Sequence, residues 1–376
     1  MSEGHDVAVT SAAPTEGLSV ARPLTVAWLG TKPSWLEHEA AAAALEPARI
    51  EWVWAGFSPS EIDGRGSPLV IHVAPDGVDT VAGLRRAFPH ARIVADLGGR
   101  TQDGDPAAGL AAASADAVLV SSPAPLQALA LRAPSLAARL RVVPPILDLD
   151  LHAPEQALLR SRDRGPLIKR FRRFHRLGVP TVLTVGPYTE AGGLDLALEL
   201  AFRLRERFEG LRLAAIPLGA VDQRYLDSCE MRALGLGHRG IVEWTVSAPE
   251  IPFWYATATV VCAPWREPGP ADPARFAAAA ARPFVGSALE PFRTEVAEGE
   301  TGFLVAAGDL AALENAVGSL LAQPERAGRI GEAGQRQAET QWGPGATAQR
   351  LLAVWSELAS SDVERAAATN GKPHPA

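Results

Sequence analysis

Cysteine is scarce in this sequence, which contains only Cys229 and Cys262 among its 376 residues. Two cysteines cannot supply the disulfide framework of a small secreted domain, so a cytoplasmic location is expected. No run approaches the roughly 20 apolar residues that a membrane-spanning helix needs. Because the first residues lack an apolar core flanked by basic side chains, we expect 1–22 to be a disordered tail and not a signal peptide.

Positive charge is also in short supply, since the formal net charge is -7. This balance argues against nucleic acid as a partner. The chain has no cysteine–histidine cluster, no Gly-x-Ser-x-Gly elbow and no phosphate-binding loop with a lysine. We therefore expect neither a metal nor another cofactor. The abundance of alanine, arginine and glycine suggests a GC-rich bacterial genome.

The sequence does contain a repeated alternation of short apolar runs and helical patterns, which predicts an α/β fold with parallel sheets. A chain of 376 residues, 47% of them hydrophobic, suits two soluble domains of ordinary size. Asp309 precedes a periodic apolar run and is predicted to cap a helix. The expected segments are a disordered tail over 1–22, a first Rossmann-like domain over 23–154, a basic linker over 155–178, a second Rossmann-like domain over 179–340, a helix over 341–358 and a disordered tail over 359–376.

The most informative stretch runs from 259 to 305. An apolar strand ends at Pro264, and a loop rich in glycine and proline follows around Glu267. An alanine-rich helix, a second strand and a tight turn before a closing strand complete the stretch. This order places a carboxylate and free backbone amides beside a crevice, outside the carboxyl ends of parallel strands, where open α/β sheets bind ligands.

Pro264, Glu267 and the segment 282–285 (Arg-Pro-Phe-Val) have the spacing of a known donor-site motif, although Trp265 stands at a serine position. The stretch resembles the retaining, nucleotide-sugar-dependent glycosyltransferases of GT-B fold, the family-four-like or group 1 set. The resemblance implies two Rossmann-like domains that face each other across a cleft, with a C-terminal helix that crosses back. It also implies transfer of a hexose from a nucleotide sugar to a glycan, lipid-linked or small-molecule acceptor.

At three positions where that family has a charged residue, this sequence has a residue that is uncharged or of opposite charge. Pro187 replaces the arginine of the phosphate clamp, and its lysine falls at Ala191 or Gly192. The second glutamate of the motif falls at Arg275 or Phe276. Since fixed cations stabilise the departing diphosphate, a second hypothesis is a catalytically inactive relative that binds a glycan, a nucleotide or a partner glycosyltransferase.

On the donor side, the resemblance makes Glu267 the catalytic candidate, close to the donor sugar. A loop carboxylate in water is the simpler interpretation. Gly186 and Gly219, at the expected ends of their strands, are donor-binding candidates or plain tight turns. Glu295 is a donor-binding candidate, a helix cap or a structural pair. Arg266, next to Glu267 in the sequence, is a further donor-binding candidate.

On the acceptor side, the candidates are Gly30 in the first strand–helix turn, His72 after an apolar strand, and Asp96. A lone histidine at a strand end is more often structural. Lys32 and Arg100 are further cations that could compensate for the missing clamp, together with Arg266.

The linker holds eight lysines or arginines against one aspartate between 160 and 176. Leu167, Phe171 and Phe174 share one face at helical spacing, so 167–176 could lie on an anionic membrane. The alternative is a solvated arm whose aromatic side chains pack between domains. The membrane interpretation would place the protein on the inner face of the membrane.

Overall fold

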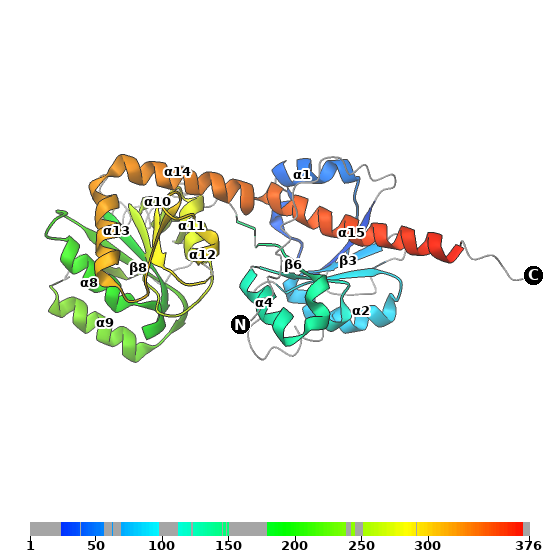
Figure 1. Cartoon of the computed structure of the whole chain (residues 1–376), viewed down its shortest axis with the longest axis horizontal. Coiled ribbons are helices and arrows are strands. Elements are labelled where there is room, and N and C mark those ends of the chain that lie inside the picture. The colour runs from blue at the N-terminus through cyan, green and yellow to red at the C-terminus, as the bar shows by residue number, and fades with distance from the viewer. Residues whose placement is uncertain are drawn as a thin grey trace, which may run out of the picture. The chain divides into compact units, whose positions relative to one another are not determined.

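A computed structural model shows the chain as two compact units, each of which is described by itself (Figure 1). Unit 1 comprises Met1–Ile146 together with Pro344–Ala376, and unit 2 comprises Leu147–Gly343. The residues that the structure describes are 24–37, 39–55, 62, 69–97, 112–121, 123–144, 146–147, 149, 179–237, 242–244, 251–290 and 292–370.

Several sequence-based predictions fall on residues outside the described ranges and stay predictions. They are the N-terminal tail over 1–22, the linker over 155–178 with its membrane-contact segment 167–176, and the cation Arg100. In the part of the chain that is described, no helix combines the length and the apolar character needed to cross a membrane.

Unit 1 contains a six-stranded parallel sheet with strand order β2-β1-β3-β4-β5-β6. Every residue of β1 and β5 is buried, as expected for parallel strands covered on both faces. Helices α1 and α15 pack on one face of the sheet, and α2 and α4 on the other. The bounds are β1 Thr25–Leu29, β2 Glu51–Trp54, β3 Leu69–Val73, β4 Arg92–Asp96, β5 Ala117–Val120, β6 Leu140–Val142, α1 Glu39–Leu45, α2 Val81–Ala87, α4 Pro123–Arg132 and α15 Pro344–Asn370.

The last helix, α15, belongs to unit 1 although it follows unit 2 in the chain. Its Trp355 is fully buried, and its Glu357 carboxylate lies 2.6 Å from the guanidinium of Arg141. The predicted end of this helix at residue 358 is wrong, because the helix continues to Asn370 into the expected tail. The polar composition suggested disorder, but no glycine or proline interrupts the helix before Gly371.

His72 lies inside β3 and not after the strand, so its expected place is corrected. Its side chain is fully buried, and its ring stacks on Trp28 with centroids 4.2 Å apart. The indole Nε1 of Trp355 donates a hydrogen bond of 3.2 Å to His72 Nδ1. Burial lowers the pKa of His72 to about 3. The histidine is thus a core residue that connects α15 to the sheet.

This burial predicts a pH dependence of the stability of unit 1. The pKa of His72 is about 3 in the folded chain and 6.5 for an unperturbed histidine, so below pH 6.5 the unfolded state binds a proton that the native state does not. The stabilisation is complete above pH 6.5 and decreases as the pH falls towards 3. We expect a loss of about 2 kcal/mol between pH 7 and pH 5, measured by urea unfolding. In His72→Gln this part of the pH dependence should be absent; an unchanged slope would contradict the prediction.

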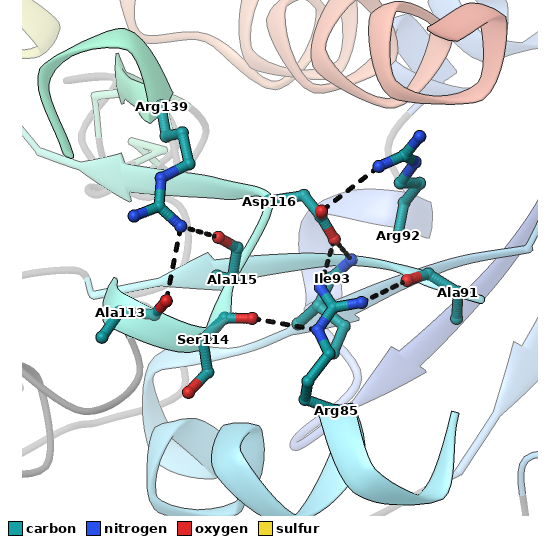
Figure 2. Close-up of polar contacts among 9 residues, drawn as sticks. All are labelled: Arg85, Ala91, Arg92, Ile93, Ala113, Ser114, Ala115, Asp116 and Arg139. Atoms are coloured by element: carbon teal, nitrogen blue, oxygen red, sulfur yellow. Dashed lines mark hydrogen bonds and ion pairs between the residues drawn. The ribbon is translucent and has the colours of Figure 1, made fainter. Parts of the chain in front are cut away.

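Figure 2 shows a charge network at the amino ends of β4 and β5. The carboxylate of Asp116, just before β5, pairs with Arg85 of α2 and lies 3.3 Å from the guanidinium of Arg92. Arg139 donates a hydrogen bond of 2.7 Å to the carbonyl oxygen of Ala115. These arginines hold the segment that enters β5, at the edge of the sheet opposite to the carboxyl ends where ligands bind.

Unit 2 also contains a six-stranded parallel sheet, with strand order β12-β11-β10-β7-β8-β9. One face is covered by α8, α9 and α13 with the start of α14, and the other by α10, α11 and α12. Asp309 accepts a hydrogen bond of 2.9 Å from the amide of Ala312, which confirms the predicted helix cap. The bounds are β7 Thr181–Tyr188, β8 Arg212–Val221, β9 Val242–Trp244, β10 Val260–Ala263, β11 Phe284–Ser287, β12 Gly302–Val305, α8 Leu194–Leu204, α9 Gln223–Gly235, α10 Ile251–Thr257, α11 Asp272–Ala279, α12 Phe292–Glu295, α13 Leu310–Ala322 and α14 Pro324–Gln341.

Candidate functional site

Each sheet has one point where its strand order reverses. In unit 2 the chain runs from β7 to β8 and β9 on one side, then crosses to β10, β11 and β12 on the other. The loops after β7 and β10 therefore leave the sheet in opposite directions. In unit 1 the corresponding strands are β1 and β3. Open parallel sheets bind ligands at such points, so these two loop pairs are the candidate sites.

In unit 2 an ion pair joins the loop after β10 to the start of α8, the helix that follows β7. Arg266, after β10, donates to Asp195 of α8 through both terminal nitrogens, Nη1 to Oδ1 and Nη2 to Oδ2, each at 2.8 Å. The backbone of Arg266 also donates to the carbonyl oxygen of Ala191 at 2.7 Å. Its Nη1 donates to the carbonyl oxygen of Glu190 at 2.9 Å. The guanidinium is therefore fixed against the segment that follows β7.

Tyr225 of α9 completes this network. Its hydroxyl donates to Asp195 Oδ1 at 2.6 Å and accepts from the amide of Asp195 at 3.2 Å. Partial burial alone would raise the pKa of Asp195, but hydrogen bonds from Arg266 and Tyr225 outweigh it and lower the pKa. The hydrogen bond with Asp195 raises the pKa of Arg266. Both side chains are thus charged near neutral pH.

Glu267 lies on the bend next to Arg266 and is exposed. Within the described ranges its carboxylate has no hydrogen bond or ion pair, in contrast to the neighbouring arginine. The structure thus brings the catalytic candidate and one donor-binding candidate to the same loop, at the carboxyl end of β10. An exposed carboxylate there is available to a ligand.

Glycines in the segment after β7 are required by close packing. Gly193 has a φ of +66°, and a Cβ on it would lie 2.0 Å from the carbonyl oxygen of Pro264. A Cβ on Gly192 would lie 1.9 Å from the carbonyl oxygen of Pro187. Gly192 is one of the two positions where the family's clamp lysine falls, and a lysine there would clash with the backbone unless the loop moved.

Gly186 and Gly219 are not at the ends of their strands, which corrects the sequence-based prediction. β7 continues to Tyr188 and β8 to Val221, and these two residues pair with each other beyond a register shift. Gly186 instead makes room for an indole, because a Cβ on it would lie 2.4 Å from Nε1 of Trp265. Gly219 is exposed with a φ of +91°, and a Cβ on it would meet no other atom within 4 Å.

Trp265 fills the space beside Gly186. It is 1% exposed, and its Nε1 donates to the carbonyl oxygen of Val185 at 2.8 Å. Its ring also packs against Phe292, with centroids 4.9 Å apart. Gly269 is equally close, since a Cβ there would lie 2.2 Å from the indole. The residue at the family's serine position is thus a core side chain.

Glu295 forms a buried ion pair. Its Oε1 lies 2.5 Å from a guanidinium nitrogen of Arg275, and the two side chains are 6% and 3% exposed. Gln337 of α14 donates to the carbonyl oxygen of Glu295 at 2.9 Å. Of the interpretations left open by the sequence, the structural pair is the one present. Its partner, Arg275, stands at one of the two positions where the resemblance places the second glutamate of the motif.

In unit 1 the loops after β1 and β3 are joined by Asp76. Its Oδ2 accepts from the hydroxyl of Thr31 at 2.6 Å and from the amide of Thr31 at 3.2 Å. Gly30 is buried with a φ of +119°, and a Cβ on it would lie 2.5 Å from Asp76 Oδ1. Lys32 is exposed and pairs with Glu37 at 3.2 Å. This turn is therefore a close polar contact between two loops.

The other acceptor-side candidates lie apart from that contact. Asp96 is the half-buried last residue of β4. His72 is enclosed by Trp28 and Trp355, so in this structure its ring is closed to a ligand. No group of three or more metal-ligating side chains occurs among the residues placed by the structure.

Two parallel sheets covered by helices, each with a ligand-binding edge, define the GT-B class of α/β proteins. The structure of Anabaena Alr3699/HepE in complex with UDP aligns with a TM-score of 0.62 at 15% identity, over 89% of this chain and 100% of that one. A Rickettsia africae glycosyltransferase structure aligns with a TM-score of 0.62 at 12% identity. Its match covers 89% of this chain and 98% of that chain. At these identities the likeness concerns the fold.

Residues 179–323 match the family model Glycosyl transferases group 1. This match lies entirely within unit 2. The GDP-mannose-dependent alpha-(1-6)-phosphatidylinositol monomannoside mannosyltransferase of Mycolicibacterium smegmatis is 30% identical over 215 residues, 54% of this chain and 53% of that protein. The D-inositol 3-phosphate glycosyltransferase of Xylanimonas cellulosilytica is 30% identical over 230 residues, 58% and 51%. The chain spans about half the length of these relatives.

Sequence reasoning missed the partners that fix the two candidate sites. Asp195 and Tyr225 hold Arg266 in unit 2, and Asp76 closes the turn in unit 1. One signal was available. An aspartate in the first turn of a helix that follows a strand lies at the ligand-binding edge, where it can meet charges on the neighbouring loop.

Proposed function

We propose that this chain transfers a hexose from a nucleotide-sugar donor to a hydroxyl of a glycan, a lipid-linked acceptor or a small molecule, with retention of anomeric configuration. The donor would bind unit 2 and the acceptor unit 1. Support comes from relatives that are named as mannosyl and inositol-phosphate glycosyltransferases. The observation that carries the proposal is Glu267, an exposed carboxylate beside Arg266 at the strand-order reversal of unit 2.

In this reaction the bond between the anomeric carbon and the phosphate oxygen breaks, and its electron pair leaves with the nucleoside diphosphate. The acceptor oxygen forms a bond to the same face of the anomeric carbon. The acceptor proton passes to the leaving phosphate, so no protein base is required. Glu267 would stabilise the positive charge that develops on the sugar ring, or bind its hydroxyl groups.

A second candidate is a glycosyltransferase-like protein without turnover, which binds a glycan, a nucleotide or a partner glycosyltransferase. The observation that favours it is the pairing of Arg266. This cation, which could replace the missing clamp, is neutralised by Asp195 at 2.8 Å. Lys32, the other described substitute, pairs with Glu37. Leaving-group stabilisation normally supplies several kcal/mol of the reduction in the barrier.

The test is a thermal-shift screen with UDP-, GDP- and ADP-sugars, followed by donor hydrolysis and transfer assays for each ligand that binds. In Glu267→Gln we expect the rate to fall by at least about 100-fold, because the charge facing the developing cation is lost. Glu300→Gln removes an exposed carboxylate elsewhere in unit 2 and should leave the rate unchanged. A folded protein that neither binds nor hydrolyses any of these donors would favour the non-catalytic candidate.

A further inference from the structure

The guanidinium of Arg266 lies at the candidate site of unit 2 and can bind an anion. It projects from the loop after β10 at the strand-order reversal, and its side chain is 34% exposed. Its two terminal nitrogens form parallel hydrogen bonds of 2.8 Å to one carboxylate. The same fork geometry suits a phosphate group equally well.

We propose that Arg266 is the phosphate-binding residue of the unit 2 site, and that Asp195 is an internal anion that a diphosphate ligand must displace. The identity of the ligand as a nucleoside diphosphate rests on the proposed function. The competition between Asp195 and an anion rests only on the geometry of this ion pair.

Contacts of Arg266 with backbone keep its guanidinium in place when the carboxylate leaves. Its own amide donates to the carbonyl oxygen of Ala191 at 2.7 Å, and its Nη1 donates to that of Glu190 at 2.9 Å. Neither contact involves Asp195. The position of the cation is therefore set by the segment after β7, and the carboxylate occupies a site that remains formed without it.

Asp195 is the side chain that decides whether an anion can enter. Its side chain is 27% exposed, and the hydroxyl of Tyr225 donates a hydrogen bond of 2.6 Å to its Oδ1. A diphosphate bound to Arg266 would lie beside this negative charge, and like charges in proximity weaken binding. Asparagine has almost the same shape without the charge. Asp195→Asn should therefore increase the affinity for anions, which is the opposite of what removal of a ligand-binding residue does.

The experiment is isothermal titration of wild type and Asp195→Asn with inorganic pyrophosphate, UDP and uridine. We expect the variant to bind pyrophosphate and UDP at least about tenfold more tightly than wild type, and uridine no more tightly. The matched control is Glu199→Gln, which removes a carboxylate from the same helix where it pairs with Arg203 and Arg232. It should leave all three affinities unchanged. Arg266→Met, added to Asp195→Asn, should abolish the gain.

Equal affinity of wild type and folded Asp195→Asn for pyrophosphate overturns the proposal, as does an equal gain in Glu199→Gln. Tyr225→Phe provides a second variant if Asp195→Asn does not fold. It removes one hydrogen bond from the carboxylate, should give a smaller gain for pyrophosphate, and overturns the proposal if it gives none. A gain for pyrophosphate without a gain for UDP would support the internal anion and count against the nucleotide-sugar function.

Discussion

Replacing Glu295 with alanine should lower the free energy of unfolding of unit 2 by about 3–5 kcal/mol, because it leaves the guanidinium of Arg275 buried without this partner. The two charged groups are 2.5 Å apart, with side chains 6% and 3% exposed. The pair joins α11 to α12, and Gln337 connects the same point to α14. Loss of the carboxylate removes the link between α11 and α12, whereas the hydrogen bond from Gln337 goes to the backbone of Glu295 and does not depend on it.

The measurement is urea unfolding of wild type and Glu295→Ala. The matched control is Glu314→Ala, which breaks a more exposed pair with Arg203 and should cost less than about 1 kcal/mol. The double variant Arg275→Met with Glu295→Leu should recover most of the loss, since it removes both buried charges. If Glu295 served only to bind a ligand, its replacement would change the affinity for that ligand and not the unfolding midpoint.

Trp265→Ala should cost about 3–5 kcal/mol, because it leaves a cavity of indole size in a core that has little freedom to collapse. The indole is 1% exposed and lies between Gly186 and Gly269, where even a Cβ would meet it at 2.4 and 2.2 Å. Both glycines are close to it through their backbone, which relaxes less easily than side chains. The hydrogen bond to the carbonyl oxygen of Val185 is lost as well.

Trp265→Phe separates the two contributions and can be measured in the same unfolding experiment. It retains an aromatic ring beside Phe292 but lacks the indole N–H, so we expect a loss of about 1–2 kcal/mol. An alanine variant as stable as the phenylalanine variant would show that the space beside Gly186 closes after truncation. That result would contradict the packing argument.

The architecture could be predicted from local patterns. Continuous apolar runs that alternate with helical patterns predicted parallel sheets, and the aspartate before an apolar periodic run predicted the cap at residue 309. Strand ends were less predictable. Gly186 was expected to end its strand, but β7 continues to Tyr188 because β8 extends to Val221 and pairs with it. A glycine marks a special backbone environment, and here that environment is the close approach of an indole.

The site was predicted only in part, because its residues come from different segments. Glu267 and Arg266 lie on the expected loop, which local sequence defined. Asp195, which pairs with Arg266, lies 71 residues before it, and Tyr225, which donates to Asp195, lies 30 residues after Asp195. His72 is 283 residues from Trp355, whose indole N–H it accepts. Residues so far apart in the sequence leave no periodic pattern within a short window. The sequence could therefore identify candidate side chains but not their partners.

The position of α15 in unit 1 sets an order of assembly during synthesis. The ribosome completes β7 to β12 of unit 2 before it makes α15, which together with α1 covers one face of the unit 1 sheet. Until then Trp28 and His72 lack the cover that Trp355 provides. Unit 1 is therefore completed after unit 2, and a nascent chain stalled before residue 344 would expose to chaperones the part of the unit 1 sheet that α15 covers.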